Sequence, residues 1–187
     1  MTQEFEPLSK PRFKVESKEG FERIVIPAAK SWFALLFLVV WLTGWTFAGI
    51  AAIAEAFSGR DTGFLIAWLC GWTLGWLFAG SWIGWQVSGK EILAVQGEAL
   101  VRGWSIFSVE RLKRYDLAHV EDLSTTTPSL PYGAMRLSYP PFFPLPMGPL
   151  KWNYGAATVY AAAGLTEAEA KLIAERLRAR MPARLKT

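Results

Sequence analysis

Two long runs without a charged residue constrain this chain more than any other feature. The first run covers residues 31–54 and has 24 residues, and the second covers residues 62–89 and has 28. About 20 apolar residues in a helix cross a hydrocarbon core roughly 30 Å thick. The polar segment between the runs is so short that the two helices must lie antiparallel. The sequence therefore predicts a membrane-spanning helical hairpin, with helices over 31–57 and 63–88 and an external connector over 58–62.

The composition favours a membrane protein and argues against several soluble classes. The chain is 52% hydrophobic and 19% charged, and it contains 10 tryptophans. A net charge of +4 is too small for a dedicated nucleic-acid binder, so no nucleic-acid partner is expected. One cysteine and one histidine cannot build a disulfide framework or a Cys/His zinc site, and the sequence has no Walker loop or Rossmann glycine fingerprint.

His119 lies near Asp116 and Ser124, but such neighbours are common, and we expect a surface histidine. We predict that the protein is not an enzyme and requires no metal or cofactor.

Basic residues flank the predicted hairpin. Residues 1–30 contain six Lys and Arg and the region after residue 89 contains thirteen, whereas the connector contains only Arg60. Because segments rich in Lys and Arg stay in the cytoplasm, both termini are expected there, close to anionic lipid headgroups. The first 30 residues also carry eleven charges, so we expect the first helix to stay as an anchor and not to be cleaved as a signal peptide.

The residues outside the hairpin predict a sheet domain. Residues 12–26 alternate in part, so the N-terminal segment 1–30 is expected to form a strand or hairpin that packs on this sheet and covers an open edge. The domain itself covers 89–187, with strands predicted over 90–95, 99–104, 111–115, 120–124, 134–139, 150–154 and 157–161. Thr166 and Glu169 form a capping-box pattern, and a closing amphipathic helix follows. The predicted fold class is a membrane α-helical hairpin joined to an α+β cytosolic domain.

This order of elements resembles small bacterial membrane proteins that have two transmembrane helices and a pleckstrin-homology-like (PH-like) domain. The resemblance rests on four segments: Ile24-Val25-Ile26-Pro27, Gln96-Gly97-Glu98-Ala99-Leu100, Tyr115-Asp116-Leu117 to Val120-Glu121-Asp122-Leu123, and Gly164-Leu165-Thr166-Glu167-Ala168-Glu169-Ala170. It implies a bent antiparallel sheet of about seven strands, capped by the C-terminal helix. It also implies the bacterial inner (cytoplasmic) membrane as location, a binding or scaffolding role in membrane assemblies, and no common catalytic residues.

Aromatic residues in the second run are candidate contacts with other molecules in the membrane. Trp68, Trp72 and Trp76 recur every four residues and fall on one helix face. This stripe either packs on lipid and the first helix, or meets another membrane subunit or a flat pigment that such a subunit holds. Because neither run contains His or Met, neither supplies an imidazole ligand to a haem or chlorophyll.

Small residues one turn apart predict helix packing, because they let two backbones approach closely. The candidate pairs are Gly44 with Ala48, Gly71 with Gly75, and Gly80 with Gly84. We expect the edge with Gly71 and Gly75 to pack on a helix, either the first span or one of a partner.

Seven of the eleven prolines lie between residues 128 and 149, which excludes a central strand there. The predicted proline-rich loop covers 139–150 and is apolar. Its large apolar residues are Phe142, Phe143, Leu145 and Met147. The loop is either a lid over the sheet's own core or, as we prefer, a contact with a partner or with the membrane surface.

These features predict a non-catalytic accessory, scaffolding or assembly subunit of a larger bacterial membrane complex, with a photosynthetic or respiratory complex as the specific expectation. Its expected partners are other integral membrane subunits and anionic lipid headgroups. The alternative is a membrane-anchored sensor or adaptor whose PH-like domain binds a lipid or a peptide reversibly.

Overall fold

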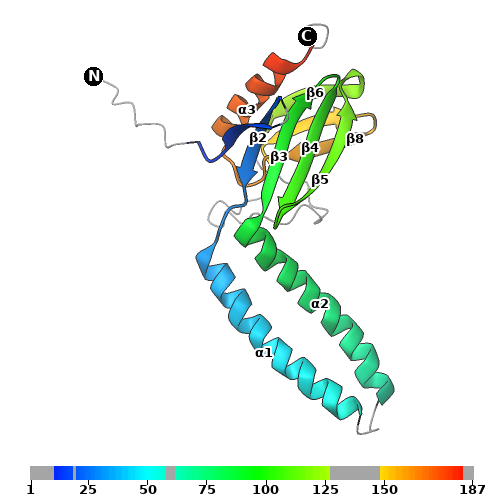
Figure 1. The fold of residues 1–187 in the computed structure, drawn as a ribbon. Coiled ribbons are helices and arrows are strands. Elements are labelled where there is room, and N and C mark those ends of the chain that lie inside the picture. Colours follow the sequence, from blue (N-terminus) through cyan, green and yellow to red (C-terminus); the bar gives the residue numbers. More distant parts are fainter. Residues whose placement is uncertain (1–10, 19, 58–61, 127–147, 183–187) are drawn as a thin grey trace, which may run out of the picture.

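The chain folds into a helical hairpin that carries a sheet domain at one end (Figure 1). A computed structural model describes residues 11–18, 20–57, 62–126 and 148–182. The hairpin consists of α1 (Trp32–Ala56) and α2 (Thr62–Ser88). Both helices are long and apolar enough to span a membrane, and only 6% of the most apolar 18-residue window of each is buried. A core helix of a soluble domain buries most of such a window, so this exposed hairpin fits a membrane environment better.

Five antiparallel strands form the first sheet, in the order β1-β2-β3-β4-β5. They are β1 (Lys14–Lys18), β2 (Phe21–Pro27), β3 (Lys90–Gln96), β4 (Ala99–Ile106) and β5 (Val109–Asp116). β2 precedes the helical hairpin and β3 follows it, yet the two strands pair, with Pro27 opposite Lys90. The N-terminal strands therefore belong to the same sheet as the chain after the hairpin, and β2 covers an edge that β3 would otherwise expose.

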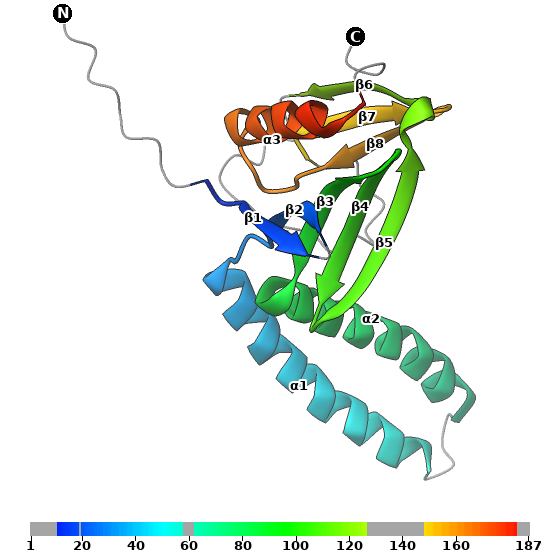
Figure 2. The same cartoon turned by 45° about the horizontal axis from the view of Figure 1, so that its top comes forward.

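A second sheet packs across the first. It contains β6 (Val120–Thr125), β7 (Leu150–Tyr154) and β8 (Ala157–Ala161), which are antiparallel. A 3-10 turn over Leu117–His119 links it to β5. The C-terminal helix α3 (Glu167–Arg180) covers the second sheet, mainly over β6 and β7 (Figure 2).

One apolar core joins the two sheets and α3. Trp152 of β7 is its largest fully buried side chain, Leu93 comes from the first sheet, and Ile173 comes from α3. The structure differs from the expected single sheet of about seven strands. It has eight antiparallel strands in two sheets among the described residues, because the turn at Leu117–His119 separates β6 from β5 and β6 pairs with β7 instead. The predicted strand over 134–139 lies outside the described residues.

The start of α3 has the capping box that the sequence predicts. Thr166 Oγ1 accepts a hydrogen bond from Glu169 N at 3.3 Å, and Glu169 Oε2 accepts one from Thr166 N at 2.9 Å. Glu169 Oε1 also accepts a hydrogen bond from Arg12 N at 2.8 Å. Partial burial raises the pKa of Glu169, but the hydrogen bonds from Thr166 and Arg12 outweigh it, so the pKa lies below its usual value. The chain before β1 is thereby tied to α3.

Candidate functional site

The two helices of the hairpin fit together through two tryptophans that fill the space beside two glycines. Trp45 of α1 lies against Gly75 of α2, where an added Cβ would stand 2.9 Å from the Trp45 ring. Trp72 of α2 lies against Gly49 of α1, where an added Cβ would stand 2.3 Å from the Trp72 ring. The rings of Trp45 and Trp72 stack, with their centroids 5.8 Å apart. The hairpin interface is therefore a reciprocal fit of large side chains beside glycines.

The predicted tryptophan stripe divides between this interface and the outer surface of α2. Trp76 Nε1 donates a hydrogen bond to Thr46 Oγ1 of α1 at 3.0 Å, so Trp76 belongs to the interface, as Trp72 does. Trp68 is 42% exposed and touches Trp72, with the two ring centroids 6.3 Å apart. Of the three residues, Trp68 presents the largest fraction of its surface to the surroundings.

The other predicted small residues of the hairpin lie mostly outside the interface. An added Cβ at Gly44 or at Gly71 would meet no described atom within 4 Å. Ala48 is exposed, and Gly80 lies beside Trp76 of its own helix. Gly71 and Trp68 lie one turn apart on α2, so an open glycine stands next to the exposed tryptophan.

The chain passes from the hairpin into the sheet through a single residue. α2 ends at Ser88 and β3 begins at Lys90, so only Gly89 lies between them. An added Cβ at Gly89 would stand 2.3 Å from the carbonyl oxygen of Trp85, so this change of direction requires glycine. Gly89 O accepts a hydrogen bond from Ala28 N at 2.9 Å, which joins the chain entering α1 to the chain leaving α2.

A buried glutamine also connects the two helix ends. The Gln86 residue is 1% exposed, and its Oε1 accepts a hydrogen bond from Ser31 N at 3.1 Å. Ser31 caps α1, since its Oγ accepts a hydrogen bond from Ala34 N at 3.4 Å. Gln86 therefore holds the start of α1 beside the end of α2.

The turn between β4 and β5 contacts the end of α2 directly. Phe107 and Ser108 adopt left-handed backbone, with φ of +46° and +72°. Phe107 N donates a hydrogen bond to Ser88 Oγ at 3.1 Å, and the Phe107 ring lies 3.1 Å from the position of an added Cβ at Gly84. We call the contacts made by Ala28, Ser31, Gly84, Gln86, Ser88, Gly89 and Phe107 the junction. Together they fix the angle between α2 and the sheet.

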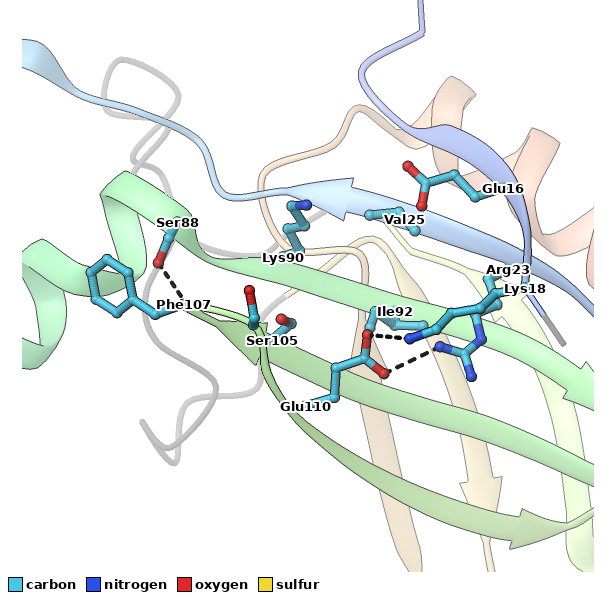
Figure 3. Close-up of a pocket in the computed structure, with 11 residues that line it drawn as sticks. Glu16, Lys18, Arg23, Val25, Ser88, Lys90, Ile92, Ser105, Phe107 and Glu110 are labelled. Atoms are coloured by element: carbon cyan, nitrogen blue, oxygen red, sulfur yellow. Dashed lines mark hydrogen bonds and ion pairs between the residues drawn. The ribbon is translucent and has the colours of Figure 1, made fainter.

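A cavity of about 560 Å³ opens on the outer face of the first sheet, beside the junction (Figure 3). Side chains alternate along a strand, so Ile92 lines this cavity while its neighbour Leu93 points into the core. Ser88 and Phe107 line the end of the cavity nearest the hairpin, and Lys18 and Arg23 line the far end, where Glu110 reaches toward them (Figure 3).

Three cations and two carboxylates line this cavity, namely Lys18, Arg23, Lys90, Glu16 and Glu110. Arg23 Nη1 lies 3.2 Å from Glu110 Oε2, and Lys18 Nζ lies 3.4 Å from Glu110 Oε1. The Arg23 side chain is 7% exposed, so this ion pair is largely shielded on the arginine side. Lys90 has no ion pair or side-chain hydrogen bond with any residue that the structure describes. The cavity thus has a charge-paired far end and an unpaired lysine close to the junction.

The basic residues of α3 mainly form ion pairs and hydrogen bonds within the sheet domain. Arg176 Nε lies 3.5 Å from Glu22 Oε1, Arg180 also pairs with Glu22, and Arg178 donates a hydrogen bond to Leu123 O. These contacts tie α3 to β2 and β6.

The remaining predicted site residues are an exposed histidine and the proline-rich loop. His119 Nδ1 lies 3.8 Å from Asp116 Oδ2, and both side chains are exposed. The described part of the chain holds no group of three His, Cys, Asp or Glu that could bind a metal. Phe142, Phe143, Leu145 and Met147 lie outside the described residues; at the end of the loop, Leu150 is fully buried.

The sequence patterns do not single out Trp45, Gly49, Gln86 or Phe107. A search for a large residue and a glycine one turn apart on both helices would find Trp45 with Gly49 and Trp72 with Gly75. A lone amide near the end of an apolar run is a signal for Gln86, because a buried polar group needs a partner.

Comparisons with protein-family models, curated proteins and solved structures found no match to this chain. The function is therefore argued from the geometry of the hairpin interface, the junction and the cavity.

Proposed function

We propose that this protein is a non-catalytic, membrane-anchored accessory or scaffolding subunit of a larger membrane complex. In this proposal α1 and α2 cross the membrane, and the sheet domain lies against one membrane face. Other integral membrane subunits contact the outer surface of the hairpin. The observation that carries the proposal is the junction, in which Gln86, Gly89 and Phe107 hold the sheet domain in one orientation on the hairpin.

A fixed junction suits a protein that positions its neighbours. A flexible linker lets a domain sample many positions, and ordering it on binding costs free energy. Here a single glycine replaces a linker, and three separate contacts surround it. This favours a scaffold over the alternative, a tethered sensor that searches for a lipid or a peptide.

The outer surface of α2 supplies a candidate contact with a partner helix. Trp68 and Gly71 repeat, one turn earlier, the spacing of Trp72 and Gly75, which pack on α1. Because helix association in lipid depends on close packing, a partner helix with the matching pattern would fit there.

The same features support a more specific proposal about the type of domain, the membrane and the kind of complex. We propose a PH-like domain, since two antiparallel sheets are followed by a C-terminal helix that covers the core. We also propose the bacterial inner membrane, with both termini cytoplasmic, because the connector has far fewer Lys and Arg than the flanking segments. A photosynthetic or respiratory complex stays the specific expectation.

The test is purification of the tagged full chain in mild detergent from its native membrane. We expect integral membrane subunits to remain bound in a fixed stoichiometry. A short Gly/Ser insert between Ser88 and Gly89 should release them, because it uncouples the sheet domain from the hairpin. The same insert after Gly97, in the exposed turn between β3 and β4, is the matched control and should retain them. Wild-type protein that purifies alone, or partners that survive the junction insert, would contradict the scaffold role.

A further inference from the structure

We propose that the cavity beside the junction binds the phosphate group of one anionic phospholipid headgroup, with Lys90 and Ser105 as its main contacts. The inference rests on the proposed membrane position of the hairpin. It narrows the expected contact with anionic lipid headgroups to one site on the sheet domain.

The strand register brings Lys90 and Ser105 together. They are directly opposite each other on β3 and β4, and both line the cavity. Side chains of such cross-strand pairs share one face of the sheet, with Cβ atoms about 5 Å apart. The Lys90 side chain is unpaired among the described residues, and the Ser105 hydroxyl makes no hydrogen bond that the structure records there. An ammonium and a hydroxyl on one face form a donor pair for a phosphate oxygen.

The charge of the cavity favours a net anionic ligand. Lys18, Arg23 and Lys90 against Glu16 and Glu110 give three positive and two negative charges, a net charge of +1. Glu110 is already paired with Arg23 and Lys18, so its charge is largely compensated. Glu16 lies on β1 opposite Arg23 of β2, and Arg23 in turn is opposite Ala94, four residues along β3 from Lys90. The positive potential is therefore concentrated near Lys90.

The cavity lies at the level where headgroups are found when the hairpin spans a bilayer. α1 has 25 residues and α2 has 27, which at about 1.5 Å per residue makes the helices roughly 38 and 40 Å long. The hydrocarbon core is roughly 30 Å thick, so the helix ends extend into the headgroup layer. Ser88, the last residue of α2, lines the cavity, and Lys90 follows two residues later.

The apolar end of the cavity lies on the hairpin side. Phe107 is 65% exposed at the tip of the β4–β5 turn and lies against Gly84 of α2. An exposed aromatic ring at the interface packs well beside the glycerol and upper acyl region of a lipid. A phospholipid with its chains along α2 would therefore present its phosphate to Lys90.

The test is native mass spectrometry of the full chain in mild detergent with equal amounts of phosphatidylglycerol and phosphatidylcholine that have the same acyl chains. We expect one retained phosphatidylglycerol per chain. Lys90→Gln should lower its retention about tenfold, because it removes a charge-assisted hydrogen bond. Ser105→Ala should lower it about threefold, as expected for one neutral hydrogen bond. Lys30→Gln, which removes an exposed positive charge just before α1 but outside the cavity, is the matched control and should change retention less than about twofold.

Equal retention of the two lipids would overturn the proposal. So would equal losses in the Lys90→Gln and Lys30→Gln variants, which would indicate attraction by general surface charge. Inorganic phosphate alone is a further probe: displacement of the lipid by millimolar phosphate would assign the site to free phosphate and overturn the lipid assignment. Near-UV circular dichroism of each variant establishes that the fold is retained. Since the readout uses the isolated chain, failure of the scaffold role would leave this result unchanged.

Discussion

The reciprocal packing of tryptophan and glycine in the hairpin predicts that Gly49→Ala destabilises the protein, although alanine is normally the better helix residue. An added Cβ at Gly49 would lie 2.3, 2.5 and 2.9 Å from three ring atoms of Trp72. Ordinary contacts begin near 3.4 Å, so the ring would have to move by about 1 Å. Trp72 cannot move freely, because its ring stacks on Trp45.

The expected change in the free energy of unfolding of Gly49→Ala is the sum of three contributions. Overpacking costs about 1–3 kcal/mol, and weakening the Trp45–Trp72 stack costs about 0.5–1.5 kcal/mol. The higher helix propensity of alanine returns about 1 kcal/mol. The net loss of stability is about 0.5–3.5 kcal/mol. Gly44→Ala, one and a half turns earlier in the same helix, gains the propensity term without a clash, since nothing described lies within 4 Å of an added Cβ there.

The assay is unfolding of the full chain in mixed micelles with increasing sodium dodecyl sulfate, followed by near-UV circular dichroism of the tryptophans. Gly49→Ala should unfold at a lower fraction of dodecyl sulfate than the wild type, and Gly44→Ala at the same or a higher fraction. Equal stability of the two variants would refute the reciprocal fit, because the two substitutions differ only in what the new methyl group meets.

Three further predictions test other contacts. Gly75→Ile should separate the helices, since an added Cβ stands 2.9 Å from Trp45, whereas Gly71→Ile should leave the packing of α1 on α2 intact. The measurement is the yield of crosslinks between cysteines introduced in α1 and α2 of a Cys70→Ser chain. An equal loss of crosslinking in the two variants would contradict this prediction. Glu91→Ala should destabilise the sheet domain by about 2–4 kcal/mol. It removes two hydrogen bonds of 2.9 Å each, one from Arg102 Nε and one from the buried Ala162 N–H. The melting temperature measures the loss, and Glu175→Ala, at an exposed position, is the control. Because the pKa of Glu169 is lowered in the folded state, its contribution to stability is present above the usual carboxyl pKa of 4.5 and is lost as the pH falls through the lower folded-state value. The loss of stability at acidic pH should therefore be smaller in Glu169→Gln than in the wild type. An unchanged loss of stability at acidic pH would contradict the capping role.

Local signals in the sequence predict several elements closely. β7 and β8 have the predicted bounds, and α3 begins at the predicted capping box, because each of these depends on residues close in the chain. β5 starts earlier than expected, at Val109, because the preceding turn uses Phe107 and Ser108 at positive φ, where sequence patterns favour glycine or asparagine.

Long-range contacts explain what the sequence leaves open. The split into two sheets depends on β6 pairing with β7, which follows it after a proline-rich segment. The junction joins Ser31 to Gln86, 55 residues apart, and no local pattern encodes that contact. The cavity needs β1, β2 and the end of α2 to meet, so a search along the chain sees its lysines as dispersed surface charge.

The central claim, that the hairpin holds the sheet domain in one position against a bilayer, is tested most directly by pulsed electron paramagnetic resonance in lipid nanodiscs. Spin labels at the exposed positions Val40 of α1 and Leu172 of α3, in a Cys70→Ser chain, report the distance between membrane helix and domain. The account predicts one narrow distance distribution that becomes broad when a Gly/Ser insert separates Ser88 from Gly89. A broad or multiple distribution in the chain without the insert would contradict it.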